Sequence, residues 1–391
     1  MRSAQRFAGP ALVLLTAPAA WGVPLDPDGR FEATLLLQPR LEMAFGDPPS
    51  LDPSLQRAWL GFSGHPAARL SFAFVAGVED FGRGGDWSAD LKLREGWLEW
   101  NFGERLQVDA GLMVPPWAAH TLLQEQSRLS PDDHAGLLSF PNGTAGRDVG
   151  LQARGRLFNH HLEYRVAGLG GVGTGQGLQE TDYDGDGTPD ADPLSPDDLP
   201  RVTARLAWSF FTPQGGPGPE GFRPRHIALE LRDGVVQSQR KLVTVGVAID
   251  HQQDALYVEH RDYTGDVVSA RRADYTALTG DLLVEMPMRD GRRSLHALVA
   301  GSWFPFDEQH PQAGPSILGE GGWRFGRWEP FGSYELHDAP DDAWDWMSWH
   351  LGLALWLPER ASALKIAGGA WRVGGGRDLD GCAQLQAQFA F

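Results

Sequence analysis

The carboxy-terminal stretch Gly381-Cys-Ala-Gln-Leu-Gln-Ala-Gln-Phe-Ala-Phe391 alternates between apolar and uncharged polar side chains. Successive side chains of a β-strand point to opposite faces, so Leu385, Phe389 and Phe391 share an apolar face and three glutamines share the other. A soluble edge strand can show the same alternation. A strand that ends on an aromatic residue, with lipid on one side and water on the other, is typical of an outer-membrane β-barrel.

The amino terminus has the pattern of a secretion signal. Arg2 and Arg6 make it basic, an apolar run follows, and Ala20-Trp21-Gly22 supplies small residues where a signal peptidase cleaves. The run is shorter than the ~20 apolar residues that a membrane-spanning helix needs, which disfavours an uncleaved anchor. We therefore predict a signal peptide at residues 1–22 and an outer-membrane β-barrel domain at residues 23–391.

The balance of charge limits the classes of partner. The chain has a formal net charge of −17, and removal of the two signal-peptide arginines makes it more negative. This sign disfavours binding to nucleic acid or to an anionic membrane surface. Cys382 is the only cysteine, so an internal disulfide is excluded.

Alternating segments of about ten residues, separated by turn residues, follow one another along the predicted mature chain. They are residues 30–45, 55–63, 68–81, 90–103, 105–116, 147–158, 161–172, 200–211, 240–253, 272–288, 293–305, 315–326, 328–338, 345–357, 362–374 and 381–391. These sixteen segments predict an all-β, transmembrane antiparallel β-barrel. The even number places both termini on the periplasmic side.

The connections between these segments mostly alternate between short and long, as periplasmic turns and external loops do. Long external loops are predicted at residues 117–146, 173–199 and 254–271. Residues 212–239 are too many for a periplasmic turn. If residues 226–231 pair as a strand with residues 255–260, the barrel has eighteen strands instead of sixteen.

Four short motifs lie within the predicted strands. They are Gln56-Arg-Ala-Trp-Leu-Gly-Phe62, Arg94-Glu-Gly-Trp-Leu-Glu-Trp100, Val108-Asp-Ala-Gly-Leu-Met-Val-Pro-Pro116 and the hairpin Leu318 to Glu335, which contains Trp328-Glu-Pro330. Together they resemble motifs of the phosphate-selective porin O and P family. The resemblance implies a sixteen-stranded homotrimeric porin whose loop after the fifth strand folds into the lumen as a constriction. Ser333 stands where that family usually has an arginine, and residues 117–146 contain no lysine.

Five arginines fall on the inward faces of three consecutive predicted strands. They are Arg154, Arg156, Arg165, Arg201 and Arg205. Arginine stays charged and binds carboxylates or phosphates with a planar fork, and rows of charge set ion selectivity in pores. These arginines are therefore candidate pore-lining groups that favour anions. The alternative is that they pair with Glu163 and neighbouring acids and only fill a polar lumen.

Acidic residues are predicted to line the opposite sector of the wall. Inward positions on the later strands hold Asp250, Asp281, Glu285, Glu320 and Glu335, and the predicted constriction loop holds Glu125, Asp132 and Asp133. A basic wall that faces these acids would create a transverse field across the pore, which orients zwitterions and small polar solutes. The alternative is a generic hydrated wall.

The segment Asp182-Tyr-Asp-Gly-Asp-Gly-Thr-Pro-Asp190 resembles the start of a calcium-binding loop. Asp182, Asp184, Asp186 and Asp190 occupy positions 1, 3, 5 and 9, and Gly187 allows the sharp turn at position 6. The twelfth position is Pro193, where an EF-hand has a glutamate. The segment is a candidate Ca²⁺ site in an external loop, and the alternative is an acidic, flexible loop tip.

The motifs of common enzymes are missing from the sequence. It has no Gly-x-Ser-x-Gly elbow, His-Glu-x-x-His helix or phosphate-binding loop, so we expect no catalysis and no required cofactor. We predict an outer-membrane diffusion porin of a Gram-negative bacterium that passes small hydrophilic solutes, including inorganic anions such as phosphate, with weak selectivity. Its expected partners are outer-membrane lipid, the barrel-assembly machinery and two further copies of itself. The alternative is a structural or adhesive barrel with a calcium-stiffened surface loop.

Overall fold

The computed structural model describes most of the predicted barrel domain. The described residues are 23–28, 30–45, 49–122, 129–130, 147–171, 200–211, 241–261, 267–288, 293–305, 313–339, 345–357, 362–373 and 380–390. The predicted signal peptide at residues 1–22 lies outside them. None of the helices in this described part is long and apolar enough to cross a membrane.

Nearly all of the regular structure is β-strand. The strands are β1 (Val23–Pro24), β2 (Phe31–Ala44), β3 (Ser50–Ala67), β4 (Leu70–Phe81), β5 (Lys92–Asn101), β6 (Gln107–Met113), β7 (Asp148–Leu157), β8 (Leu162–Leu169), β9 (Arg201–Ser209), β10 (Leu242–Arg261), β11 (Val267–Pro287), β12 (Arg293–Phe304), β13 (Gly314–Phe325), β14 (Trp328–His337), β15 (Trp346–Trp356), β16 (Ala363–Val373) and β17 (Asp380–Ala390). The described helices are a 3-10 turn, η1 (Arg83–Gly85), and one turn of α-helix, α1 (Ala119–Leu122).

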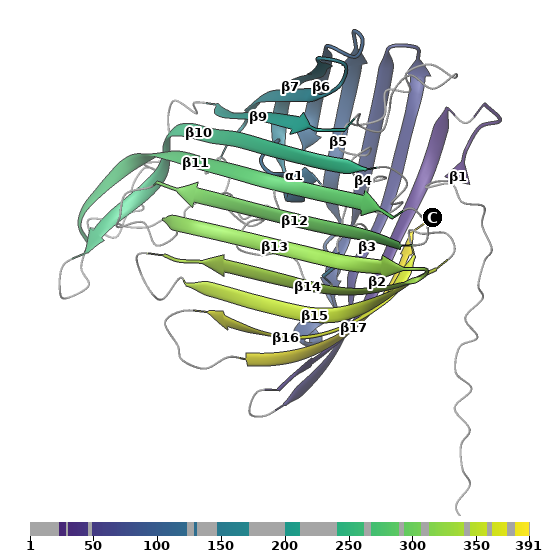
Figure 1. The fold of residues 1–391 in the computed structure, drawn as a ribbon. Helices are drawn as coiled ribbons and strands as arrows, with labels where there is room; N and C mark the ends of the chain where they lie inside the picture. The colour runs from purple at the N-terminus through teal and green to yellow at the C-terminus, as the bar shows by residue number, and fades with distance from the viewer. Residues whose placement is uncertain are drawn as a thin grey trace, which may run out of the picture.

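Strands β2 to β17 close into one antiparallel barrel (Figure 1). Each pairs with the next along the chain, β9 pairs with β10, and β17 pairs with β2 in a register that sets Leu385 opposite Leu41. The short β1 adds a second partner to the start of β2. The predicted all-β barrel of sixteen strands is confirmed.

The alternative count of eighteen strands is wrong, because residues 255–260 continue β10. Leu256 in that segment pairs with Ala273 of β11. Residues 226–231, which the eighteen-strand alternative pairs with residues 255–260, lie outside the described residues. The long β10 and β11 instead form a hairpin that extends past the neighbouring strands at one rim (Figure 1).

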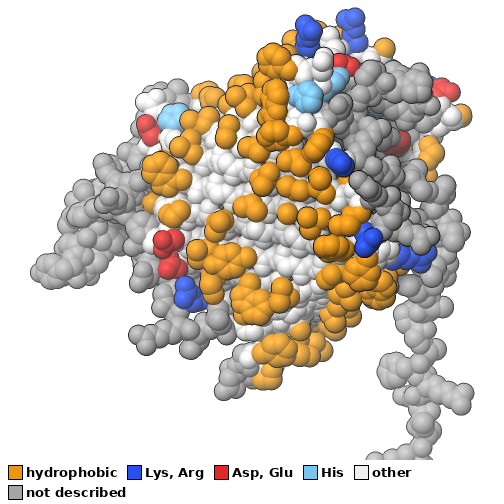
Figure 2. Space-filling model, viewed as in Figure 1, with side chains coloured by type: hydrophobic (Ala, Val, Ile, Leu, Met, Phe, Trp, Pro, Cys, Tyr) orange, Lys and Arg blue, Asp and Glu red, His pale blue; other side chains and the backbone are white. Residues whose placement is uncertain are grey.

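Apolar side chains cover the outside of the barrel and polar side chains line the inside. On β9, Val202, Leu206 and Trp208 are 41–51% exposed, whereas Arg201 and Arg205 between them are at most 3% exposed. Hydrophobic side chains spread over much of the outer face in view (Figure 2). This is the sidedness of a strand between lipid and an aqueous lumen.

The three shortest connections, β3–β4, β7–β8 and β13–β14, lie at one rim, where the described chain also begins and ends. Strands β13 and β14, for example, are joined by Gly326 and Arg327 alone, with Gly326 at a φ of 63°. Glycine adopts this left-handed conformation without steric cost. By the rule for bacterial outer-membrane barrels, this rim faces the periplasm and the rim with the β10–β11 hairpin faces outward.

The connection between β6 and β7 enters the barrel. Its described parts are residues 114–122, which include α1, and residues 129–130. Helix α1 lies against β11 and β12, which stand four and five places after β7 in the order of the barrel strands. For these described residues, the prediction that the loop folds into the lumen is confirmed, and we call the whole connection, residues 114–146, the luminal loop.

Candidate functional site

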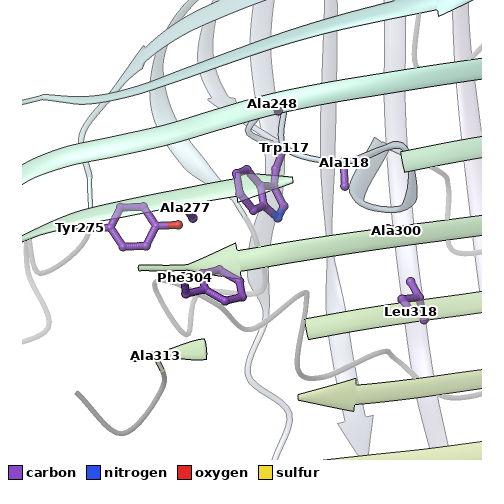
Figure 3. Packing of buried hydrophobic residues seen from close by; sticks show 9 residues of the cluster. All are labelled: Trp117, Ala118, Ala248, Tyr275, Ala277, Ala300, Phe304, Ala313 and Leu318. Atoms are coloured by element: carbon purple, nitrogen blue, oxygen red, sulfur yellow. The ribbon is translucent and has the colours of Figure 1, made fainter. Parts of the chain in front are cut away.

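The first part of the luminal loop packs against the inner wall formed by β10 to β13. Trp117 is 5% exposed, and its ring lies 6.3 Å from that of Phe304 on β12. Figure 3 shows Trp117 and Ala118 among small and aromatic residues of the wall. The other members of this cluster are Ala248, Tyr275, Ala277, Ala300, Phe304, Ala313 and Leu318. Apolar residues on an inward face thus mark where the loop rests.

A carboxylate and an arginine hold the backbone of the same part of the loop. The Ala119 N–H donates to Asp281 Oδ2 at 3.1 Å. The Arg205 guanidinium pairs with Asp281 and also donates to the Trp117 carbonyl oxygen at 3.4 Å. Arg205 on β9 therefore reaches across β10 to reinforce the contact between β11 and the loop.

Gly246 of β10 makes this reach across the strand possible. A Cβ at that position would stand 2.2 Å from Arg205 Nη2 and 2.7 Å from Asp281 Oδ1, closer than real Cβ atoms approach such groups. A larger residue there would force the ends of the Arg205 and Asp281 side chains to shift, so glycine lets the ion pair between β9 and β11 keep this position. The glycine is therefore part of the site although it offers no functional group.

The five arginines predicted to line the pore all lie on the inner wall, and each of them is at most 6% exposed. Arg154, Arg165 and Arg205 stand directly opposite one another across β7, β8 and β9. Like charges in such a row repel, and each of these side chains has an acid beside it. Arg165 Nε, for example, lies 2.6 Å from Glu163 Oε1.

Arg154 and Arg201 each have several polar contacts. Arg154 pairs with both Glu99 and Asp109. Arg201 donates to Asp250 from both Nε and Nη2. Asp250 also accepts from the Thr203 hydroxyl at 2.9 Å and from the Tyr275 hydroxyl at 3.1 Å. Arg156 faces Glu163 across β7 and β8. The geometry matches the alternative in which the arginines pair with neighbouring acids. Their role in selectivity stays a prediction.

The expectation that the acids form a separate, opposite sector is wrong for Asp250 and Asp281. Because β10 and β11 follow β9 directly around the barrel, these two acids bind Arg201 and Arg205 instead of facing them across the pore. Glu285 and Glu335 are buried on the inner wall, and Glu320 contacts the luminal loop. A transverse field that depends on Asp250 and Asp281 is therefore not supported.

A second group of arginines surrounds Trp59 of β3, and the sequence prediction missed it. The guanidinium carbons of Arg57, Arg94 and Arg147 lie 5.4–5.8 Å from the centre of the Trp59 ring. Glu79 accompanies them, with Oε2 2.8 Å from Arg94 Nη1. We call these residues the Trp59 cluster.

Irregular pairing explains why alternation did not reveal the Trp59 cluster. The register shifts by one residue between β2 and β3 beside Arg57, and between β4 and β5 beside Arg94. A bulge places two successive residues on one side of the sheet. Gln56 and Arg57 are accordingly both buried. The sequence signal for this cluster is the Arg-x-Trp of residues 57–59.

Several predicted site residues lie outside the described residues. They are Glu125, Asp132 and Asp133 of the luminal loop, and Asp182, Asp184, Asp186 and Asp190 of the candidate calcium loop. Within the described ranges, no group of three or more His, Cys, Asp or Glu residues is placed to hold a metal ion.

Comparison with known proteins gives a fold but no sequence relative. No family model matches the chain, and no curated protein matches it significantly. Among solved structures, it is similar to OprB of Pseudomonas putida, with a TM-score of 0.57, 10% identity and coverage of 93% of this chain and 95% of that one. The chain has a porin fold.

Two further porin-like channels show the same likeness. The anion-selective porin from Comamonas acidovorans matches with a TM-score of 0.54 at 12% identity, over 92% of this chain and 99% of that one. The outer membrane channel DcaP of Acinetobacter baumannii matches with a TM-score of 0.53 at 11% identity, over 92% and 97%. Together with the apolar outer face, this fold places the chain in the outer membrane of a Gram-negative bacterium.

Proposed function

We propose that this chain is a diffusion porin that passes small hydrophilic solutes through a hydrated lumen. The observation that carries the proposal is the luminal loop, which crosses inside a closed sixteen-stranded barrel whose inner wall is polar. A loop fixed in the lumen narrows the passage without blocking it. Passage by diffusion requires no cofactor and no energy source.

The proposed charge preference is weak. Arg154, Arg165, Arg201 and Arg205 are each paired with at least one carboxylate, so little of their charge remains to select ions. The Trp59 cluster brings three more guanidiniums together on the barrel wall, where Arg94 pairs with Glu79 and Arg147 lies 3.8 Å from Glu95. Together with the motif resemblance, this supports passage of inorganic anions such as phosphate, at a slight advantage over cations.

We also propose the export route and assembly that the motif resemblance implies. Residues 1–22 are removed on export, the barrel-assembly machinery inserts the chain beside outer-membrane lipid, and three copies associate. Light scattering of the purified protein tests the last point. A mass that corresponds to one copy plus detergent would refute the trimer.

Liposome swelling tests the function with solutes of graded size. Vesicles that contain the protein should swell quickly in small neutral sugars and progressively more slowly as the sugar grows. A rate for phosphate that is slightly higher than the rate for a monovalent organic cation of similar size would agree with the weak preference for anions. Vesicles that swell no faster than protein-free vesicles would refute the proposal.

A further inference from the structure

The luminal loop has a second attachment, at Leu129 and Ser130, on a different part of the inner wall. The wall residues that receive it come from β13 to β16, and we call them the loop dock. They are Glu320, Gly322, Phe331, Ala354, Trp356, Ala363 and Ala367. We propose that the loop dock sets the width of the pore by fixing the position of the luminal loop. This inference rests on the proposed porin function.

The polar half of the loop dock is a single carboxylate. Glu320 Oε1 accepts from the Leu129 N–H at 3.1 Å, and Oε2 accepts from the Ser130 N–H at 2.9 Å. Buried backbone N–H groups require an acceptor, and a carboxylate offers two equivalent oxygens to two successive groups. A glutamine at this position offers one acceptor oxygen and an alanine offers none.

The apolar half is a pocket for the Leu129 side chain. Leu129 is 2% exposed and packs with Phe331, Trp356 and three alanines. A Cβ on Gly322 would stand 2.7 Å from Leu129 Cδ1 and 2.8 Å from Glu329 Oε1, so an alanine there would force the Leu129 or Glu329 side chain to shift. A hydrogen bond stabilises the wall of this pocket: the Trp356 Nε1–H donates to Glu329 Oε2 at 2.5 Å.

The two attachments hold the luminal loop at separate places. Residues 117–122 rest on β10 to β13, and residues 129–130 rest on β13 to β16. Six residues join them. Release of the loop dock would leave the attachment around Asp281 in place, so the loop would move within the lumen while the barrel stays intact.

Single-channel conductance separates positioning by Glu320 from a simple effect of its charge. Glu320→Gln and Glu320→Ala remove the same charge but leave one and no acceptor oxygen. We expect Glu320→Ala to raise the conductance by roughly 1.5-fold or more, because conductance follows the width of the constriction. Glu320→Gln should change it less. Gly322→Ala, which keeps the charge, should raise the conductance with an unchanged reversal potential.

Thiol labelling reports on the loop dock without any need for a channel function. Ser130→Cys in a Cys382→Ser background should react slowly with a water-soluble maleimide, because Ser130 is 4% exposed. Adding Glu320→Ala should speed the reaction at least about tenfold if the loop leaves the wall. Heat-modifiable migration on gels verifies that each variant is a folded barrel.

The outcomes distinguish the two levels of the proposal. Wild-type protein that forms no channels would overturn the proposed function, and this inference with it. Wild-type channels with unchanged conductance and labelling in Glu320→Ala and Gly322→Ala would overturn only the loop dock. Equal changes for Glu320→Gln and Glu320→Ala, with none for Gly322→Ala, would show that the charge alone matters and would also overturn it.

Discussion

Replacing Arg154 with methionine leaves two buried carboxylates without their cation. Arg154 and Glu99 are 0% exposed and Asp109 is 1% exposed. Arg154 Nε lies 2.9 Å from Asp109 Oδ2, and the guanidinium also pairs with Glu99. Removing one partner of a buried ion pair costs about 3–5 kcal/mol, because the charge left behind is desolvated and unpaired. We expect the free energy of unfolding to fall by that amount.

Urea unfolding of the barrel in lipid vesicles, followed by tryptophan fluorescence, measures this change. The matched control is the triple variant Arg154→Met/Glu99→Gln/Asp109→Asn, which removes all three charges together. It should recover most of the lost stability, since neutral groups cost less to bury. A loss below about 1 kcal/mol for Arg154→Met alone would show that the site behaves like an exposed ion pair. Arg154 would then be available to act on permeating ions, as the sequence had suggested.

Three further predictions follow from other parts of the chain. Gly246→Ala should separate Arg205 from Asp281 and increase the noise of the open-channel current, and quiet recordings would contradict the steric argument. The 182–190 loop should bind calcium in roughly the sub-millimolar to millimolar range, and calorimetry should show the heat disappear in Asp184→Asn/Asp186→Asn. Phe391→Ala should lower the amount of barrel in the outer membrane without changing the folded barrel, so an equal yield would count against it.

The strands could be predicted because their signal is local. A strand between lipid and water must alternate, and this constraint appears in every segment without knowledge of its partner. Residues 200–211 were predicted as a strand with Arg201 and Arg205 inward, and β9 spans Arg201–Ser209 with both arginines buried. The number of strands followed from the same local pattern.

The contacts of the inner wall could not be predicted in the same way, because they depend on the register between neighbouring strands and on how far each side chain reaches. Arg201 binds Asp250, which stands opposite Thr203 in the pairing of β9 with β10. Alternation predicts that both side chains face inward, but it does not predict that they meet. Bulges made the Trp59 cluster equally hard to predict, because one extra residue reverses which of the following side chains point inward.

The loop dock could not be predicted from the sequence for a different reason. Leu129 is an ordinary apolar residue in a long predicted loop, and Gly322 is one of several glycines in its strand. Their relation appears only when the luminal loop is placed against β13 to β16. Glu320 was predicted to face inward, but its acceptance of two loop N–H groups has no signature in the sequence.

Single-channel recording of the wild-type protein in planar lipid bilayers tests the central claim most directly. A diffusion porin should give discrete, long-lived steps whose conductance rises in proportion to the salt concentration. Its reversal potential in a salt gradient should stay near zero or indicate a slight preference for anions. The absence of steps from folded, heat-modifiable protein would contradict the account of this barrel as a porin.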